Sequence, residues 1–309
     1  MRAEGTSLHM GMAAHISVCI CTYKRPALLK CALEALRMQE TDRLFTFSIL
    51  VVDNDHAESA RAVVTEVAAD SSISVEYCVE PQQNIALARN RAVENATGDF
   101  VAFLDDDEFP IKCWLLTLFK ACHDHNVDGV LGPVKPYFDK DAPEWVVKGD
   151  FYNRPTYPTG FVIDWRKGRT GNVLLKKELF AAGEQPFRPQ FRVGEDQDFF
   201  RRSIEKGYVF IWCNEAVAYE FVPPIRWRKT FMLRRALLRG ATSSQHSTFG
   251  AHDVAKSIIA VPAYAAVLPL SLILGQRSFM TYLIKLFDHL GRLLALLGIR
   301  PVKGAYVTE

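Results

Sequence analysis

The fold of this chain is decided at residues 97–110, TGDFVAFLDDDEFP, where an apolar run meets a cluster of acids. Phe100 to Leu104 has the short apolar pattern of a strand that is buried on both faces. Adjacent carboxylates repel each other unless a cation lies between them, and hard cations such as Mg²⁺ or Mn²⁺ prefer oxygen ligands. The pattern therefore predicts a buried strand that carries a binding site at its end, with a solvated acidic turn as the alternative. The acids are Asp105, Asp106, Asp107 and Glu108.

Strands and helices are expected to alternate on both sides of this run. The apolar patterns predict strands at 15–21, 47–52, 75–79, 129–132, 170–175, 207–212 and 216–221, and helices at 27–39, 59–69, 84–95, 114–126 and from 195 onward. This alternation is typical of an α/β protein with a parallel sheet and crossover helices. The stretch 133–166 is rich in Pro, Tyr and Trp and has no clear period, so we expect a long ordered loop there.

Polar residues follow three of the predicted strands at the point where each strand ends. They occupy positions 22–25, 53–55 and 105–108. Ligands of parallel sheets bind outside the carboxyl ends of the strands. We therefore expect a nucleotide-type site at this edge of the sheet.

A second acidic pair, Glu195 and Asp196, lies in the segment GEDQDFFRR, residues 194–202. Gly194 permits a tight turn, which would place both acids in the first turn of a helix. Acids at this position are ordinary partners of the helix dipole. The pattern alone leaves open whether the pair caps the helix or performs chemistry.

Composition limits the class of protein. Of the 309 residues, 49% are hydrophobic and 23% are charged, which is enough for a full core and excludes general disorder. The net charge of +2 argues against a general nucleic-acid binder. The seven cysteines have no metal-type pair spacing, so free thiols in a reducing cytoplasm are expected.

The C-terminal region, residues 223–309, has the composition of a membrane-associated helical segment. Residues 226–239 contain six basic residues and no acid, which indicates a basic amphipathic helix, with a merely solvated basic face as the alternative. Residues 257–276 carry no charge and are long enough to span a bilayer. Pro262 and Pro269 would kink such a helix, so an in-plane or re-entrant hairpin remains the alternative.

Five segments in the expected order resemble the family 2 glycosyltransferases of the GT-A fold, and among them the bacterial enzymes that assemble succinoglycan-type exopolysaccharides on a lipid carrier. The segments are ISVCICTYKRP (16–26), VVDN (51–54), NIALARNRA (84–92), GDFVAFLDDDE (98–108) and GEDQDFFRR (194–202). The resemblance implies a Rossmann-like, mixed but mainly parallel sheet flanked by helices over residues 15–222. The basic and apolar helices of residues 223–309 would then serve membrane or acceptor association.

The resemblance also implies a role for individual residues. The nucleotide of a UDP-sugar would be bordered by Thr22 and Tyr23, with Asp53 at the uracil edge. The metal ion, Mg²⁺ or Mn²⁺, would be held by Asp107 and by Asp105, which also lies near the ribose. Asp196 would be the catalytic base. The other residues of the donor site would be Arg25, Arg89 and Glu195.

The chemistry of such a transfer explains why these residue types are needed. Negative charge grows on the departing diphosphate, and a metal ion stabilises it. The acceptor hydroxyl is a weak nucleophile, so a carboxylate must take its proton. One base on the face opposite the leaving group favours a single displacement with inversion. The implied reaction moves a hexose, with glucose favoured, from a UDP-sugar to a lipid-diphosphate-linked oligosaccharide at the cytoplasmic face of the bacterial inner membrane.

Two departures from the family pattern and two alternative functions remain. A histidine that many relatives use as a metal ligand is missing near Glu220, which either replaces it or leaves the ligand absent. The Gln-x-x-Arg-Trp signature of processive synthases is also missing, which favours addition of a single sugar.

A sugar nucleotidyltransferase would need a glycine-rich loop, and residues 22–26 contain no glycine. Retention of Asp107 and Asp196 argues against a non-catalytic membrane scaffold.

Overall fold

A seven-stranded sheet forms the centre of the N-terminal part of the computed structural model. Its strands are β1 (Ala14–Thr22), β2 (Phe45–Asp53), β3 (Val75–Val79), β4 (Phe100–Leu104), β6 (Gly129–Leu131), β8 (Asn172–Lys176) and β9 (Phe210–Trp212). They lie in the order β3-β2-β1-β4-β8-β6-β9. Only β8 runs antiparallel to its neighbours β4 and β6, among the pairs described for this sheet. The expected mixed, mainly parallel α/β sheet is confirmed.

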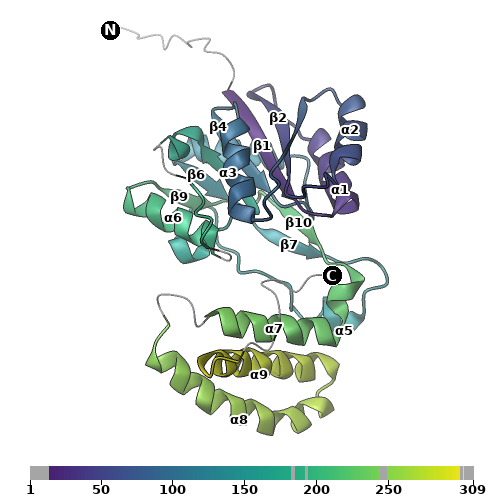
Figure 1. Ribbon diagram of the computed structural model, residues 1–309, viewed down its shortest axis with the longest axis vertical. Helices are drawn as coiled ribbons and strands as arrows, with labels where there is room; N and C mark the ends of the chain where they lie inside the picture. The colour runs from purple at the N-terminus through teal and green to yellow at the C-terminus, as the bar shows by residue number, and fades with distance from the viewer. Residues whose placement is uncertain (1–13, 182–184, 192–193, 244–248, 300–301, 303–309) are drawn as a thin grey trace, which may run out of the picture. The chain divides into compact units, whose positions relative to one another are not determined.

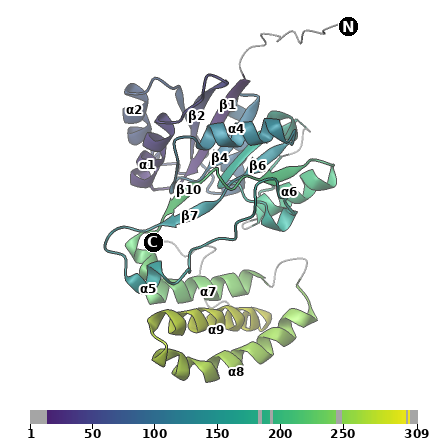
Figure 2. The same ribbon diagram turned by 180° about the vertical axis from the view of Figure 1, so that it is seen from behind.

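Helices cover both faces of this sheet (Figures 1 and 2). One face packs against α1 (Pro26–Arg37), α2 (Arg61–Ala69) and α4 (Trp114–Asp124), and the other against α3 (Ile85–Asn95) and α6 (Glu195–Glu205). Two local features agree with the sequence. Pro26 opens α1, where its missing N–H costs nothing, and Asn84 caps α3 by accepting a hydrogen bond from the Ala86 N–H.

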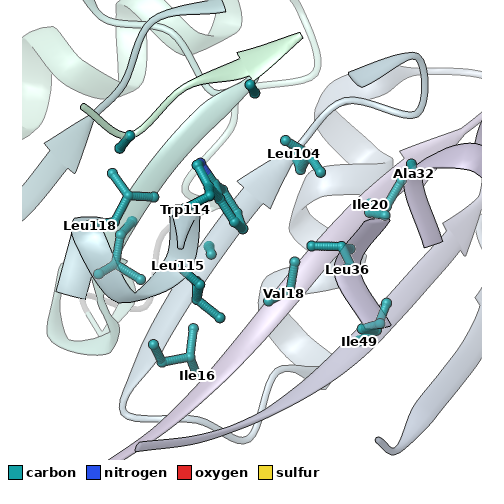
Figure 3. Close-up of a cluster of buried hydrophobic side chains, with 14 of the residues drawn as sticks. Ile16, Val18, Ile20, Ala32, Leu36, Ile49, Leu104, Trp114, Leu115 and Leu118 are labelled. Atoms are coloured by element: carbon teal, nitrogen blue, oxygen red, sulfur yellow. The ribbon is translucent and has the colours of Figure 1, made fainter. Parts of the chain in front are cut away.

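Side chains of the central strands alternate between the two cores. Val18 and Ile20 of β1 point into the core shown in Figure 3, whereas Cys19 between them packs in the other core. The first core also contains Trp114, which is fully buried and donates its indole N–H to Asn172 Oδ1 at 2.8 Å. Burial on both faces explains why these strands are nearly continuous apolar runs.

A second, three-stranded sheet corrects the expectation of a structureless loop over 133–166. This sheet contains β5 (Glu108–Pro110), β10 (Ala218–Phe221) and β7 (Val134–Tyr137), in that order. Pro136 removes one backbone donor from β7, which is tolerated because β7 lies at the edge of the sheet. The same stretch contains the short helix α5 (Glu144–Val147) and the start of the 3₁₀ helix η1 (Trp165–Lys167). A second 3₁₀ helix, η2 (Lys177–Phe180), follows β8.

The structure describes residues 14–181, 185–191, 194–243, 249–299 and 302, and these divide into two units. The first unit comprises residues up to 135 and residues 154–221, and it contains the large sheet together with β5 and β10 of the small one. The second unit comprises residues 136–153 and the chain from 222 onward. All seven cysteines lie within the described residues, and all are free thiols, as expected.

Three long helices make up most of the second unit. After the 3₁₀ helix η3 (Pro224–Trp227) come α7 (Lys229–Ser243), α8 (Ala251–Ile273) and α9 (Gln276–Leu296). In both views α9 lies between α7 and α8 (Figures 1 and 2). Helix α8 continues through Pro262 and Pro269. Among the described residues it is the one helix whose length and mean hydropathy, 1.7, would suffice to cross a membrane.

Candidate active site

The carboxyl ends of β1, β2 and β4 meet at one edge of the large sheet. Thr22, the last residue of β1, is in register with Asp53, the last residue of β2. Strand β4 pairs with β1 on its other side and ends at Leu104, directly before Asp105. The three polar clusters expected from the sequence are therefore neighbours.

The middle acid of the cluster, Asp106, anchors the loop that follows β1. Its side chain is buried and accepts a hydrogen bond from Thr22 Oγ1 at 2.8 Å. Arg25 Nη1 lies 3.2 Å from Asp106 Oδ1 and 3.4 Å from Asp107 Oδ2. Burial raises the pKa of Asp106, and the charge of Arg25 opposes that rise. Two residues predicted to contact the donor, Thr22 and Arg25, thus hold the acidic turn in place.

Arg89 connects the acidic turn to the second acidic pair. Its guanidinium is buried, with Nη2 at 3.8 Å from Asp105 Oδ1, and Nη1 donates a hydrogen bond to Glu195 Oε1. Burial would lower the pKa of Arg89, but the charges of Glu195 and Asp105 outweigh this effect and raise it. The Asp105 side chain is 42% exposed, so it remains accessible to a ligand. Residues from β4, α3 and α6 are thereby brought into one site.

Asp196 lies beside Glu195 in the first turn of α6. Gly194, with φ of 87°, occupies the left-handed conformation that the expected tight turn requires. The Asp196 side chain is half-buried, and its Oδ1 accepts a hydrogen bond from the Gln197 N–H at 2.8 Å. Burial raises the pKa of Asp196 above that of an ordinary aspartate, while Arg89 and Arg169 act in the opposite direction. A half-buried carboxylate of raised pKa has the properties of a general base.

Asp198, the next acid on α6, forms ion pairs within the protein. Asp198 is buried and lies 2.9 Å from Arg202 Nε, 3.4 Å from Arg201 Nη2 and 3.8 Å from Arg188 Nη1. Three cations therefore neutralise Asp198. Asp196 has no cation within salt-bridge distance among the described residues.

Glu108 lies beneath the acidic turn, at the start of β5. Both of its carboxyl oxygens are buried and have no hydrogen-bond partner among the described residues, although Arg154 Nη1 lies 3.9 Å from Oε1. Burial raises the pKa of Glu108 well above its usual value, and Asp105 adds to the effect. A Cβ atom at Gly171 would lie 2.8 Å from Asp105 Oδ2 and 3.0 Å from Glu108 Oε1, so only glycine allows this approach.

Asp53 and Tyr23 have less direct relationships to this cluster. The Asp53 carboxylate is fully enclosed and accepts hydrogen bonds from the Ala60 N–H at 2.8 Å, the Tyr77 hydroxyl at 3.0 Å and the Asp55 N–H at 3.1 Å. The contacts with Asp55 and Ala60 hold the segment that follows β2, and Tyr77 belongs to the neighbouring strand β3. Tyr23 is half-buried, and its ring lies 5.2 Å from Lys24 Nζ.

The acids of this site have the donor chemistry that a divalent cation requires. Asp105 is accessible, Asp107 lies in the same turn, and the buried oxygens of Glu108 have no hydrogen-bond donors in the described chain. Carboxylate oxygens suit Mg²⁺ or Mn²⁺. The described residues contain no cluster of three or more His, Cys, Asp or Glu side chains already gathered as a metal site. The residues fit such an ion in kind, and Asp107 also lies within 3.4 Å of Arg25 Nη1.

Some residues of the site had no role in the sequence analysis. Asp106 received no individual role, because nothing in a run of three aspartates tells which one faces inward. Arg154 lies in the stretch that was expected to be a loop, and its contacts with Glu108 and Glu220 follow from pairing of β5 with β10. Gly171 could have been suspected, since a glycine directly before a strand often marks a close approach.

Comparison with known proteins now places the chain in a family. The model of Glycosyl transferase family 2 matches residues 17–175. The succinoglycan biosynthesis protein ExoM of Rhizobium meliloti (strain 1021) is 34% identical over 244 residues, which cover 78% of this chain and 77% of ExoM. This chain belongs to glycosyl transferase family 2. It is therefore a glycosyltransferase rather than a sugar nucleotidyltransferase.

Two further proteins resemble this glycosyltransferase, one in its structure and one in its sequence. The mannosyltransferase PcManGT from Pyrobaculum calidifontis, solved with GDP-Man and Mn²⁺, has a TM-score of 0.60 at 18% identity, over 92% of this chain and 87% of that one. That likeness confirms the GT-A fold. The GalNAc(5)-diNAcBac-PP-undecaprenol beta-1,3-glucosyltransferase of Campylobacter jejuni is 27% identical over 114 residues, or 35% of each chain.

Proposed function

We propose that this glycosyltransferase moves a hexose, with glucose favoured, from a UDP-sugar to a lipid-diphosphate-linked oligosaccharide in exopolysaccharide biosynthesis. The reaction depends on Mg²⁺ or Mn²⁺ and inverts the anomeric configuration. The observation that carries the proposal is the bridge made by Arg89, which joins Asp105 of the acidic turn to Glu195 beside Asp196. The names of ExoM and of the undecaprenol-linked glucosyltransferase support the pathway and the lipid-linked acceptor.

Asp196 is the base in this proposal. Its pKa is raised by burial, and its position beside the Arg89 bridge supports proton removal from an acceptor hydroxyl next to the bound donor. The acceptor oxygen then forms a bond to the anomeric carbon while the bond from that carbon to the phosphate oxygen breaks. One base opposite the leaving group gives inversion, so an α-linked donor yields a β-linkage.

The donor is held by residues from five places in the fold. Thr22 ends β1, Tyr23 and Arg25 follow it, and Asp53 at the end of β2 supports the neighbouring segment from within. Asp105 and Asp107 hold the divalent ion, whose charge stabilises the departing diphosphate when the ion is bound. Arg89 and Glu195 fix the donor side of the site relative to Asp196.

The second unit supports association with a membrane surface. Several apolar side chains of α8 and of the short turn after it are exposed to solvent in the part of the chain that the structure describes. Residues 229–297 contain eight basic and two acidic residues, so this region would be attracted to anionic lipid. The exposed apolar residues are Ile258, Ile259, Val267, Leu270, Leu272, Ile273 and Leu274.

An in-plane position of α8 is favoured over a crossing. Helix α9 packs along α8, with Ser257 Oγ 3.0 Å from His289 Nδ1. If α8 entered the hydrocarbon core, α9 would accompany it and carry Lys285, Asp288 and Arg292 into lipid. Each such charge costs about 2.5–3.5 kcal/mol at the centre of a bilayer. We propose that α8 lies at the interface on the cytoplasmic face, with its apolar side in the lipid.

A donor screen tests this function. Purified protein is mixed with a membrane extract from an exopolysaccharide-producing bacterium and with a panel of radiolabelled UDP-sugars, GDP-mannose and dTDP-glucose. We expect label from one UDP-hexose to enter the lipid fraction with Mn²⁺ or Mg²⁺ and none to do so after chelation with EDTA. Transfer only from a non-uridine donor, or undiminished transfer in EDTA, would contradict the proposal.

A further inference from the structure

A basic segment beside the candidate base has no part in the function described so far. Residues 166–169, Arg-Lys-Gly-Arg, place three cations within four positions. Arg166 pairs with Asp164 at 3.3 Å, and the Lys167 ammonium lies 5.7 Å from the centre of the Tyr157 ring. Arg169 makes neither a hydrogen bond nor an ion pair with any residue that the structure describes.

The segment is fixed on both sides of Arg169. A Cβ atom at Gly168 would lie 2.3 Å from the ring of Phe200 on α6, the helix that carries Asp196. On the other side, Gly171 approaches the carboxylates of Asp105 and Glu108 closely. The backbone carbonyl of Arg166 also accepts a hydrogen bond from Gln197 of α6 at 3.3 Å. Arg169 is therefore held between the helix of the candidate base and the acidic turn.

Arg169 has no ion-pair partner among the described residues, although the charges of Asp196 and Glu220 partly offset the desolvation of its guanidinium. The side chain is exposed to solvent, yet enough protein surrounds it that desolvation, together with the nearby charge of Arg154, lowers its pKa. Arg154 itself is paired with Glu220 and Glu108, so it differs from Arg169 in having acidic partners. A bound anion would relieve the repulsion between the two guanidinium groups.

The groups around Gly171, two positions from Arg169, are polar and incompletely paired. The hydroxyl oxygen of Thr170 is buried without a hydrogen-bond partner in the described chain, as are both carboxyl oxygens of Glu108. These atoms are enclosed by the protein, so they describe a polar environment beside Arg169 and are not contacts of a ligand.

We propose that Arg169 binds a non-bridging phosphate oxygen of the nucleoside diphosphate, next to Asp196. The inference rests on the proposed function, to which it adds a catalytic residue. During transfer the bond between the anomeric carbon and the diphosphate oxygen breaks, and its electron pair stays on the diphosphate. The acceptor proton goes to Asp196. Arg169 exchanges no proton and stabilises the charge that grows on the leaving group by a charge-assisted hydrogen bond.

The test measures binding rather than turnover. Titration calorimetry compares the affinity of wild type and Arg169→Gln for UDP and for uridine, in the presence of Mn²⁺. Arg166→Gln, in the same segment but paired with Asp164, is the matched control. We expect Arg169→Gln to weaken UDP binding by about tenfold to a hundredfold, the range of a hydrogen bond to a charged group, and to leave uridine binding unchanged. Arg166→Gln should change neither affinity by more than about twofold.

The outcomes separate this inference from the proposed function. Unchanged UDP affinity in Arg169→Gln overturns the inference, even if an acceptor then binds more weakly. Equal weakening of UDP and uridine also overturns it, because the loss would then not belong to the phosphates. If wild type binds GDP or ADP instead of UDP, the proposed donor is wrong, and the same comparison is made with that diphosphate and its nucleoside. Absence of binding to every nucleoside diphosphate would overturn both.

Discussion

The buried guanidinium of Arg89, on α3, donates a hydrogen bond to Glu195 at the start of α6, 106 residues later in the chain. The same group lies 3.8 Å from Asp105. Because the helix of the candidate base and the acidic turn share one cation, their relative position depends in part on this side chain. The first prediction concerns that dependence.

Replacement of Arg89 should damage stability and activity together. Arg89→Leu leaves the buried Glu195 without its partner, so we expect the free energy of unfolding to fall by about 3–5 kcal/mol. Urea denaturation measures this change. Arg91→Leu on the same helix is the control, because Arg91 is 43% exposed and its loss should cost about 1 kcal/mol or less. Equal effects of the two substitutions would show that the Arg89 bridge has no special importance.

Thr22 and Asp106 should act as one unit in donor binding. Their hydrogen bond of 2.8 Å joins the loop after β1 to the acidic turn. We expect Thr22→Val and Asp106→Ala each to weaken UDP binding, and the double variant to be little worse than Asp106→Ala. A coupling of about 0.5–3 kcal/mol in a double-mutant cycle, measured by calorimetry, is expected for residues in contact. Additive losses would contradict the shared role.

The rate should depend on pH through Asp196. A base acts in its deprotonated form. The enzyme should therefore keep its full kcat/KM at pH values above the pKa of Asp196 in the folded protein, and kcat/KM should fall as the pH drops through that pKa. Burial raises that pKa above the ordinary 3.8, so the acid limb should lie above pH 3.8. Arg169 lowers the pKa of Asp196, and Arg169→Gln should therefore move the limb to higher pH. A pH profile of kcat/KM checks both statements, and an acid limb that Arg169→Gln leaves in place would contradict the assignment.

The apolar face of α8 should determine membrane binding. Ile259 is 70% exposed and Leu270 is 64% exposed. Sedimentation with vesicles that contain anionic lipid should fall strongly in the double variant Ile259→Glu/Leu270→Glu, because charged side chains then face the hydrocarbon. Val209→Glu, a charge introduced at an exposed apolar position of the first unit, is the control and should sediment like wild type. Binding should also weaken with added salt.

The strands and helices that the sequence predicts are those with a regular pattern of apolar residues. Strands buried on both faces, such as β1 and β4, are continuous apolar runs, and α1 shows its buried stripe and its opening proline. Strand β7 gives no such pattern, because it is a short edge strand with a proline inside it. Its position depends on pairing with β10, a contact between distant segments that local sequence does not encode.

The candidate site was predictable in its location but not in its internal pairing. Acids at strand ends identify the edge of the sheet where Asp105 and Asp107 lie. They do not reveal that Asp53 is enclosed by the segment after β2 and by Tyr77 of β3, or that Asp106 pairs with Arg25. Those distinctions depend on which way each side chain turns, and neighbouring acids in a run are equivalent in sequence. That Arg169 has no ion-pair partner among the described residues likewise becomes visible only when its surroundings are known.

The measurement that tests the central claim most directly compares Asp196→Asn with wild type in UDP-hexose transfer and in UDP binding. The substitution keeps the size of the side chain and removes its ability to accept a proton. Glu205→Gln makes the same chemical change at an exposed position near the end of α6. We predict that Asp196→Asn loses at least about a hundredfold in kcat while UDP affinity stays within about threefold of wild type, and that Glu205→Gln behaves as wild type. Transfer by Asp196→Asn at the wild-type rate would contradict the assignment of Asp196 as the base.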